Sequence, residues 1–134
     1  MNDTLRRQSE QAAVARRILI VEDDDDSREM LVELIGMLGH RAIGAPNAKD
    51  ALRVARDEQP DVALIDIGLP DVSGVDFARS LRATPNGANM RLVALTGYSD
   101  SVTRQLAAEA GFDDFVVKPF STENLATLLS NPQL

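Results

Sequence analysis

The sequence predicts a doubly wound α/β fold, in which five parallel strands alternate with five helices. Short aliphatic runs typical of strands recur along the chain, separated by segments with apolar residues at helical spacing. The runs ILIV and VALI are almost continuously apolar, which is typical of central strands covered by helices on both faces. This alternation indicates βαβ units and therefore a parallel sheet. The expected strands are residues 18–22, 41–44, 61–66, 91–95 and 112–117.

Each expected helix combines an apolar stripe with a residue that can cap its first turn. The stripes are, in chain order, Met30, Leu31, Leu34, Ile35 and Leu38; Ala51, Leu52 and Ala55; Phe77, Ala78 and Leu81; Val102 and Leu106; and Leu125, Leu128 and Leu129. The expected caps, whose side chains can accept from free backbone N–H groups, are Asp26 or Ser27, Asn47, Ser73, Ser99 and Ser121. Asp25 is expected to lie in the solvated first turn of the first helix, where its charge suits the helix dipole.

Length and composition indicate one compact soluble domain. The chain has 134 residues, of which 44% are hydrophobic and 26% charged, so it can build a single core but has no room for a second folded domain. We expect this domain to span residues 18–130. A flexible polar arm at residues 1–17 is expected before it, and a short tail at residues 131–134 after it.

Charge and residue content argue against several classes of function. The net charge of −7 disfavours direct binding of DNA or RNA, because nucleic-acid affinity depends on lysine and arginine contacts with phosphate. Without cysteine, the chain cannot form disulfides, thiolate metal sites or a cysteine nucleophile. No apolar run approaches the roughly 20 residues of a membrane-spanning helix, and the N-terminus lacks the apolar core of a signal peptide. We therefore expect a cytoplasmic protein without a membrane partner.

Polar residues gather where the expected strands end. They are Glu22, Asp23 and Asp24 after the first strand, Asp66 after the third, Thr96 after the fourth and Lys118 after the fifth. Ligands of doubly wound sheets bind at the carboxyl ends of the strands, so these residues are expected to share one edge. Carboxylate oxygens from Asp23 and Asp66, with Glu22 nearby, are ligands that suit Mg²⁺. Without a cation, the cluster would repel itself, and at least one carboxyl pKa should rise.

The lysine and threonine on the same edge suit an anion. Together with a divalent cation, Lys118 and Thr96 would position and neutralise a phosphoryl group, which is most of what catalysis of its transfer requires. Asp66 is the expected nucleophile, because a carboxylate can form an acyl phosphate and divide the transfer into two steps. An acid that follows four apolar residues must also reach the surface or find a partner, whereas Thr96 and Lys118 taken singly have ordinary structural explanations.

Four segments resemble, in order and spacing, the signature blocks of two-component response-regulator receiver domains. They read RILIVEDDDDSREML, DVALIDIGLPDVSG, LVALTGYS and GFDDFVVKPF, and the resemblance covers about residues 17–130. It implies a flavodoxin-like (βα)5 sandwich with strand order 2-1-3-4-5 and a phosphoacceptor role in a phosphorelay. Mg²⁺ is the implied cofactor, with Mn²⁺ able to substitute for it.

The resemblance assigns the metal ligands and the acceptor. Asp66 would be the phosphoacceptor, and Glu22 and Asp23 would bind the metal directly or through water. The backbone carbonyl of Gly68 would complete the metal site, and its N–H group would contact a phosphoryl oxygen. Gly68 stands where a larger residue is common, so the acceptor is expected to be open to water. Tyr98 is expected to cover it in part, so Tyr98→Ala should change the rate of phosphate loss.

The resemblance also implies a switch. Thr96 and Lys118 would hold the phosphoryl oxygens, aided by the N–H group of Gly97, and the bond between Lys118 and Pro119 would be cis. Phe115 would turn inward when Thr96 moves toward the phosphoryl group. Tyrosine is frequent at this position in the family, and phenylalanine lacks the hydroxyl group that could signal outward.

These roles imply a signalling domain that acts on no separate substrate and catalyses only its own phosphorylation and dephosphorylation. A sensor histidine kinase or a histidine phosphotransfer protein would donate the phosphoryl group. A population shift would then reshape the surface at roughly residues 99–130 for an output protein that the sequence does not name. Because the chain ends at Leu134, we expect a stand-alone regulator or the receiver of a hybrid kinase, with no attached output domain. The last helix lacks arginines that many transcription-factor receivers use to dimerise, so we expect a monomer or weak dimer.

Other metal and phosphate chemistries fit less well. An EF-hand loop needs alternating acids, then Gly at the sixth position and Glu at the twelfth, which no frame starting within residues 22–26 supplies. Phosphatases of the haloacid dehalogenase type usually carry a second aspartate two residues after the nucleophile, where this chain has Gly68. A hydrolase of small phosphate esters is therefore the weaker alternative. A degenerate receiver that binds partners irrespective of phosphate is a third, against which the complete residue set argues.

Overall fold

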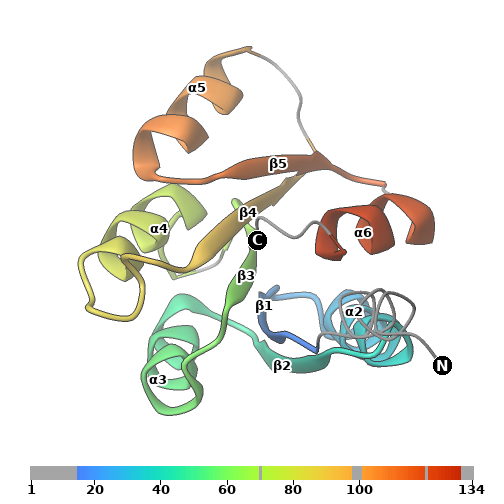
Figure 1. Cartoon of the computed structure of the whole chain (residues 1–134). Helices are drawn as coiled ribbons and strands as arrows, with labels where there is room; N and C mark the ends of the chain where they lie inside the picture. Colours follow the sequence, from blue (N-terminus) through green and yellow to red (C-terminus); the bar gives the residue numbers. More distant parts are fainter. Residues whose placement is uncertain (1–14, 70, 98–100, 120, 131–134) are drawn as a thin grey trace, which may run out of the picture.

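The computed structural model describes residues 15–69, 71–97, 101–119 and 121–130. Strands and helices alternate strictly through these ranges (Figure 1). The strands are β1 (Arg17–Val21), β2 (Arg41–Ala45), β3 (Val62–Asp66), β4 (Arg91–Thr96) and β5 (Asp114–Val117). The helices are α2 (Asp25–Met37), α3 (Ala48–Glu58), α4 (Gly74–Arg82), α5 (Ser101–Ala110) and α6 (Thr122–Leu129). None of these helices has the length and apolar character needed to cross a membrane.

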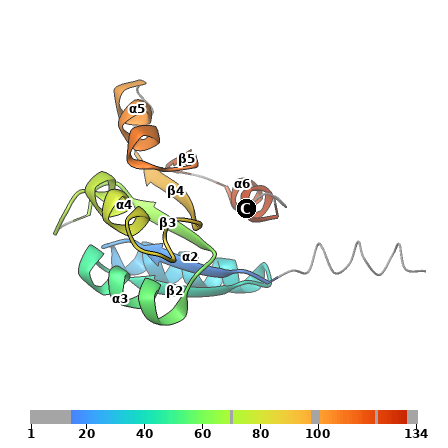
Figure 2. The same cartoon turned by 60° about the vertical axis from the view of Figure 1, so that its left-hand side comes forward.

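The strands form one parallel sheet in the order β2-β1-β3-β4-β5. Figure 2 shows this sheet running from β2 at the bottom of the view to β5 at the top. Helices α3, α4 and α5 cover one face, and α2 and α6 cover the other (Figure 1). The predicted doubly wound fold and its strand order are confirmed. Because the order reverses between β1 and β3, the carboxyl ends of these two strands are where a ligand site is expected.

Two apolar clusters, one on each face of the sheet, explain why the central strands are apolar throughout. Leu19 and Val21 of β1 belong to the cluster under α3, α4 and α5, whereas Ile18 and Ile20 belong to the cluster under α2 and α6. All four side chains are fully buried. Burial of each such side chain contributes about 1.5 to 3 kcal/mol, so a slip of β1 along its neighbours would be costly. The end of β1, and with it the following acidic segment, is held in place.

Three of the predicted helix starts are confirmed. Asn47, Ser73 and Ser121 each accept a hydrogen bond from the N–H group three residues further on, at 2.8, 3.1 and 3.0 Å. These bonds satisfy N–H groups that have no partner within their own helix. The fourth predicted cap, Ser99, lies outside the described residues.

The predicted start of α2 is wrong by two to three residues. The N-cap is Asp24, which accepts from the N–H group of Ser27 at 2.9 Å, rather than Asp26 or Ser27 itself. Asp24 has an extended backbone, with φ −74° and ψ 118°, so the helix begins immediately after it. Hydrogen bonds from Ser27 lower the pKa of Asp24, which favours the charged form of the cap. Asp25 lies exposed in the first turn, as expected.

The chain before β5 departs from the expected strand at residues 112–117. β5 begins at Asp114, and the preceding Asp113 meets Leu92 partly through its side chain. The N–H group of Asp113 donates to the Leu92 carbonyl at 2.8 Å, while its carboxylate accepts from the Leu92 N–H group at 2.9 Å. A side-chain acceptor thus replaces the backbone acceptor that a regular ladder would use. Phe112 is buried beside this contact, as expected for a core residue.

The apolar stripe expected on α5 does not face the sheet. Val102 and Leu106 are 65% and 45% exposed, whereas Ala107 and Ala110 are buried. Residues three or four apart share one face of a helix, so the two large residues lie on one face and the two alanines on another. The small alanines let α5 pack closely, and the larger pair stays at the surface.

Candidate functional site

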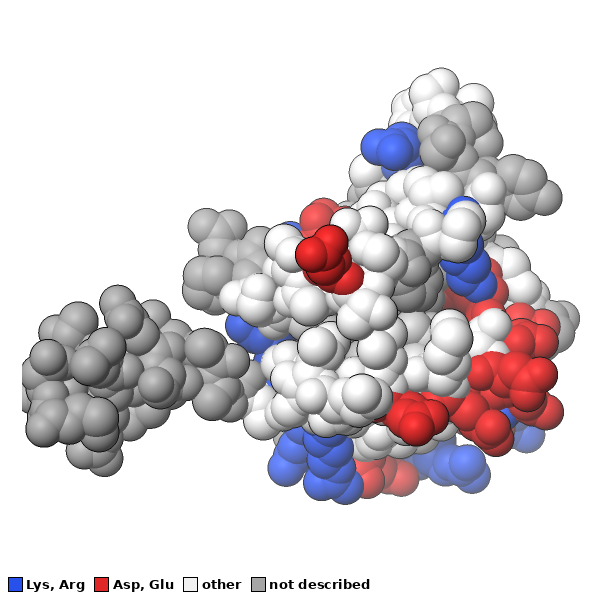
Figure 3. Space-filling model, turned by 90° about the vertical axis from the view of Figure 1, so that its right-hand side faces the viewer, with Lys and Arg blue, Asp and Glu red and all other residues white. Residues whose placement is uncertain are grey.

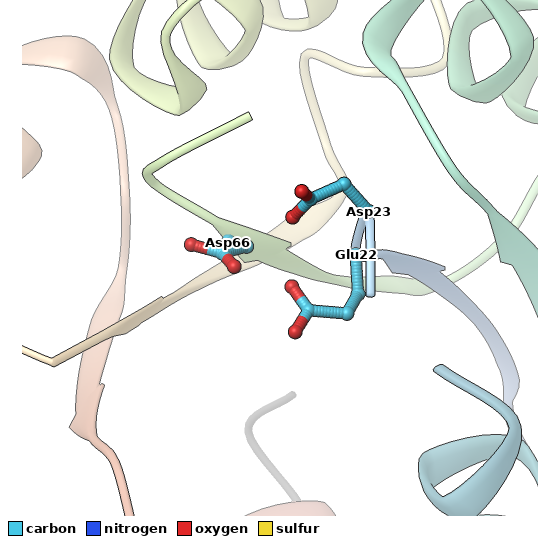
Figure 4. Close-up of side chains that lie close together, drawn as sticks. All are labelled: Glu22, Asp23 and Asp66. Carbon is cyan, nitrogen blue, oxygen red and sulfur yellow. The ribbon is translucent and has the colours of Figure 1, made fainter. Parts of the chain in front are cut away.

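Three carboxylates converge at the carboxyl edge of the sheet. Glu22 and Asp23 follow β1, and Asp66 is the last residue of β3. Because β1 and β3 are paired with Val21 opposite Ile65, the next residue of each strand emerges beside the other. One oxygen of each of the three carboxylates lies within 4.8 Å of the others (Figure 4). The structure therefore brings together the three acids expected at this edge.

Lys118 reaches the cluster from the end of β5. Its Nζ donates to Glu22 Oε1 and to Asp66 Oδ2, at 3.1 Å in each case. Its backbone N–H group donates to the carbonyl of Thr96 at 2.7 Å, and its bond to Pro119 is cis, as expected. Burial by itself would lower the pKa of Lys118, but the hydrogen bonds and charges of Asp66 and Glu22 raise it. The ammonium group therefore stays charged and pairs with two of the acids.

Asp66 receives a hydrogen bond on each of its oxygens. Oδ1 accepts from the N–H group of Gly68 at 2.9 Å, and Oδ2 accepts from Lys118. Burial opposes ionisation of Asp66, but hydrogen bonds with Glu22, Gly68 and Lys118 outweigh it and lower the pKa. The side chain is 16% exposed, so it is sheltered and still reachable. An ionised, partly accessible carboxylate has the properties of a nucleophile.

Glu22 is the member of the cluster whose charged form is least favoured by its surroundings. Its side chain is 3% exposed, and burial, followed by the hydrogen bond with Asp66, raises its pKa to about 7 although Lys118 opposes the shift. Its Oε2 is buried and has no hydrogen-bond partner among the described residues. A buried carboxylate oxygen without a partner is costly. The expected rise of one carboxyl pKa is confirmed, and a cation would supply the missing partner.

The donor set fits a hard divalent cation. Mg²⁺ prefers oxygen ligands and usually keeps several waters beside one or two carboxylates. Glu22 is buried, Asp66 is half-buried and Asp23 is exposed, so the cluster opens to solvent on one side. That opening leaves space for water molecules and for an incoming group. Glu22, Asp23 and Asp66 together can therefore hold a divalent metal ion.

The end of β4 lies beside Asp66. Asp66 is opposite Leu95 in the sheet, so Thr96 lies one residue further along the neighbouring strand. Thr96 is 3% exposed, and Gly97 follows it at the exposed edge. A Cβ atom added at Gly97 would meet no described atom within 4 Å, and one added at Gly68 would meet only Asp66 Oδ1, at 3.7 Å. As glycines, neither residue places a side chain beside Asp66.

Phe115 lies in β5, opposite Ala94 of β4. Its ring is half-buried and packs against the apolar cluster under α3, α4 and α5. Arg104 of α5 lies over the ring, with its guanidinium carbon 5.0 Å from the ring centroid, which is a cation–π contact. Tyr98, expected to cover the acceptor, lies outside the described residues.

Gly74, the first residue of α4, is a feature of this edge that the sequence analysis missed. A Cβ atom there would lie 2.5 Å from the backbone oxygen of Asp66 and 2.6 Å from Cα of Ile67. Only glycine lets α4 begin this close to the end of β3. The N–H group of Gly74 also donates to the carbonyl of Ile67 at 2.7 Å. The one sequence signal was a glycine directly after the cap Ser73.

Asp71 was missed as well. Its carboxylate accepts from the N–H groups of Ala48 and Lys49 at the start of α3, at 3.1 and 3.2 Å. The bond from Ala48 is the largest cause of a lowered pKa at Asp71. The segment that follows Asp66 is therefore tied to a helix 22 or 23 residues earlier in the chain. No local pattern could have predicted this contact.

The acidic run makes this edge negative. Asp23, Asp24, Asp25 and Asp26 are exposed, and Figure 3 shows acidic side chains gathered on the right of the face that carries α2 and α6. A surface of one sign raises the local concentration of ions of the opposite sign. The edge therefore favours the approach of a divalent cation.

The comparisons with known proteins agree on one family. The family model described as response regulator receiver domain matches residues 18–130. The transcriptional regulatory protein KdpE of Mycobacterium tuberculosis is 40% identical over 91 residues, which are 68% of this chain and 39% of KdpE. The phosphate regulon transcriptional regulatory protein PhoB of Pseudomonas aeruginosa is 34% identical over 102 residues, 76% of this chain and 44% of PhoB. The chain thus spans about two fifths of the length of these relatives.

A solved structure gives the same result. The receiver domain of the sensor histidine kinase PA1611 from Pseudomonas aeruginosa is 29% identical, with a TM-score of 0.79. The match covers 87% of this chain and 95% of that one. That crystal structure has a magnesium ion coordinated in its active site cleft.

Proposed function

Because the chain belongs to the response regulator receiver domain family, we propose that Asp66 is its phosphoacceptor and takes a phosphoryl group from a histidine kinase or a histidine phosphotransfer protein. The domain is a phosphoacceptor module of two-component signalling. The observation that carries the choice of residue is the convergence of Glu22, Asp23 and Asp66, with Lys118 bonded to two of them. Asp66 combines a lowered pKa with access to solvent.

In the proposed reaction, an Asp66 oxygen attacks the phosphorus atom of a phosphohistidine. A P–O bond forms to Asp66 while the P–N bond to the imidazole breaks, and the departing nitrogen takes up a proton. Lys118, now 3.1 Å from Asp66 Oδ2, would pair with the new negative charge. The hydroxyl group of Thr96 and the N–H groups of Gly68 and Gly97 would donate to the other phosphoryl oxygens.

We propose Mg²⁺ as the metal, with Mn²⁺ able to substitute. Glu22, Asp23, Asp66 and the backbone carbonyl of Gly68 would hold it. When bound, the metal neutralises charge on the transferred group, which is the main requirement of this chemistry. The raised pKa and the unpartnered oxygen of Glu22 support a cation at this place. The magnesium ion in the PA1611 receiver domain supports the identity of the metal.

The proposed output is a change of surface at α5, β5 and α6, roughly residues 99–130. Movement of Thr96 toward the phosphoryl group would let Phe115 turn inward, and the population of this packing would rise with phosphorylation. The exposed pair Val102 and Leu106 lies on α5, within that surface. The domain would later hydrolyse its own acyl phosphate. It would act on no separate phosphate ester. Phosphatases of the haloacid dehalogenase type usually have a second aspartate two residues after the nucleophile, and this chain has Gly68 at that position.

The remaining properties of the whole protein are proposals of the same kind. KdpE and PhoB are transcriptional regulators more than twice as long as the matched segment, so the absence of direct DNA binding is proposed for this chain only, on its net charge of −7. We also propose a cytoplasmic location, a monomer or weak dimer, and an output protein as partner. The proposed domain spans residues 18–130, between an arm at 1–17 and a tail at 131–134.

Incubation with MgCl₂ and acetyl phosphate, followed by intact-mass measurement, tests the acceptor. We expect the wild type to gain one phosphoryl group, and Asp66→Asn or added EDTA to abolish the gain. Asp57→Asn, which alters an exposed acid on α3 paired with Arg56, is the matched control and should be phosphorylated like the wild type. No gain in the wild type, with a cognate kinase as well as with acetyl phosphate, would contradict the proposal. Steady release of phosphate from many esters would favour a hydrolase.

A further inference from the structure

Arg28, near the start of α2, connects this helix to the metal cluster. Its Nη1 donates to the backbone carbonyl of Glu22 at 2.9 Å, and its Nη2 donates to Asp25 Oδ1 at 2.6 Å. The Arg28 side chain is only 17% exposed, so the guanidinium group lies against the protein. An exposed ion pair with Asp25 would by itself contribute little. The hydrogen bond to the Glu22 carbonyl is the contact that connects Arg28 to the metal cluster.

The backbone of Glu22 is thereby held on both sides. Its N–H group donates to the carbonyl of Ala45 in β2 at 3.1 Å, and its carbonyl accepts from Arg28. This carbonyl belongs to the peptide group that joins Glu22 to Asp23. Because a peptide group is planar, a hydrogen bond to its oxygen restrains the directions in which both side chains leave the backbone. Two of the three carboxylates therefore depend on the position of one guanidinium group.

Gly44 leaves the space that Arg28 occupies. It lies in β2 opposite Ile20 of β1, under the aliphatic part of the Arg28 side chain. A Cβ atom at residue 44 would lie 2.9 Å from Cγ of Arg28 and 3.0 Å from Cδ, so the arginine would have to move. Glycine within a strand often marks such a close approach. Arg28, Val32 and Gly44 line an open groove at the surface, so the displaced side chain has room to move toward solvent.

We propose that Arg28 is a positioning residue for the metal site: seated over Gly44, it orients the peptide group between Glu22 and Asp23 so that both carboxylates face Asp66. This inference rests on the proposed function, because it assumes that the cluster binds Mg²⁺. The role needs arginine, since a guanidinium fork bonds a carbonyl and a carboxylate in one plane, which a lysine ammonium cannot do. Substituting a residue that hydrogen-bonds to a metal ligand typically weakens metal binding by about 10- to 100-fold.

The sign of the effect separates positioning from charge. A guanidinium group near a metal ion repels it, so charge alone predicts tighter Mg²⁺ binding after Arg28→Ala. Positioning predicts weaker binding. Gly44→Ala keeps the net charge and displaces Arg28 through its new Cβ atom. Positioning therefore predicts weaker Mg²⁺ binding, whereas charge alone predicts unchanged or tighter binding.

Calorimetric titration of the full chain with Mg²⁺ measures the Kd without any phosphoryl transfer. We expect Arg28→Ala, Arg28→Lys and Gly44→Ala to bind Mg²⁺ about tenfold more weakly than the wild type. The matched control is Arg53→Ala, which breaks an arginine–aspartate pair with Asp50 of the same i,i+3 spacing on α3 and should leave the Kd unchanged. Arg28→Ala combined with Gly44→Ala should be no weaker than Arg28→Ala alone, because both remove one contact.

Thermal melting of each variant shows whether it is folded at the titration temperature. If Gly44→Ala does not fold, Arg28→Lys still separates positioning from charge, because it keeps the positive charge and removes the guanidinium group. An unchanged or lower Kd in the folded Arg28 and Gly44 variants overturns the proposal, as does an equal loss in Arg53→Ala. A wild type that does not bind Mg²⁺ overturns the metal site itself, which is a different result from a wild type that binds and variants that bind equally well.

Discussion

Replacing Glu22 by glutamine removes the buried carboxyl group while keeping its shape and one oxygen. In the fold, burial raises the pKa of this carboxyl from 4.5 to about 7, with the hydrogen bond to Asp66 adding to the shift and Lys118 opposing it. Above pH 7 and without a metal ion, the folded protein therefore contains a carboxylate whose ionisation its surroundings disfavour. We expect Glu22→Gln to increase the free energy of unfolding under these conditions.

The sign and size follow from proton linkage. Because the folded-state pKa of Glu22 lies above its ordinary value, the stability contributed by its proton is complete below about pH 4.5 and is lost as the pH rises through about 7. A rise from 4.5 to about 7 corresponds to about 3 kcal/mol at higher pH, which is an upper value because glutamine also buries an amide group. Asp66 affects stability in a different pH range. Because its pKa is lowered in the fold, the stability contributed by its charged form is lost only as the pH falls below 3.8.

Urea unfolding followed by circular dichroism, in EDTA at about pH 8 and about pH 4.5, measures this difference. We expect Glu22→Gln to be more stable than the wild type at the higher pH and the advantage to shrink at the lower pH. Saturating Mg²⁺ should cancel most of this advantage, because an ion at one hundred times its Kd adds about 2.7 kcal/mol to the stability of the protein that binds it. A variant no more stable than the wild type at pH 8 in EDTA, or a difference independent of pH, would refute this reasoning.

Two further substitutions probe α4 and β5. Gly74→Ala places a methyl group 2.5 Å from a backbone oxygen at the end of β3, so urea titration should show a loss of about 1 to 3 kcal/mol. Gly36→Ala, whose Cβ atom would meet no described atom within 4 Å, should instead stabilise α2 by about 0.5 kcal/mol; equal effects would contradict the close approach at Gly74. Arg104→Ala removes a cation–π contact of about 0.5 to 1 kcal/mol, so fluorine NMR of labelled phenylalanine should show the inward population of Phe115 rising about two- to fivefold. Arg79→Ala, which breaks an arginine–aspartate pair on α4, should leave that signal unchanged. An unchanged signal in Arg104→Ala would show that the cation–π contact does not hold the ring of Phe115 outward.

The site at the carboxyl edge could be predicted because it depends on topology. Apolar runs identified β1 and β3, and once these strands are adjacent and parallel, Glu22 and Asp66 must emerge together. Lys118 could be placed at the same edge because β5 ends there, and its long side chain spans the width of β4 to reach both acids. These residues could be recognised in the sequence as site candidates because each one ends a strand or directly follows one.

Contacts between a side chain and a distant backbone group could not be predicted. Asp71 binds the start of α3, and Arg28 binds the carbonyl of Glu22 across Gly44; neither pairing has a local pattern. Helical spacing also shows that Val102 and Leu106 share a face without showing which face meets the sheet. That choice belongs to tertiary packing, in which small alanines of α5 fit against the sheet and the larger residues do not.

Chemical location of the phosphoryl group tests the central claim most directly. Borohydride reduces an acyl phosphate to an alcohol, so a phosphorylated aspartate becomes homoserine and can be found by peptide mass spectrometry. After treatment with acetyl phosphate, we expect homoserine at Asp66 with Mg²⁺ present and no conversion in EDTA. Conversion at another acid, such as Asp23, or an equal yield at Asp66 in EDTA, would contradict Asp66 as the metal-dependent acceptor.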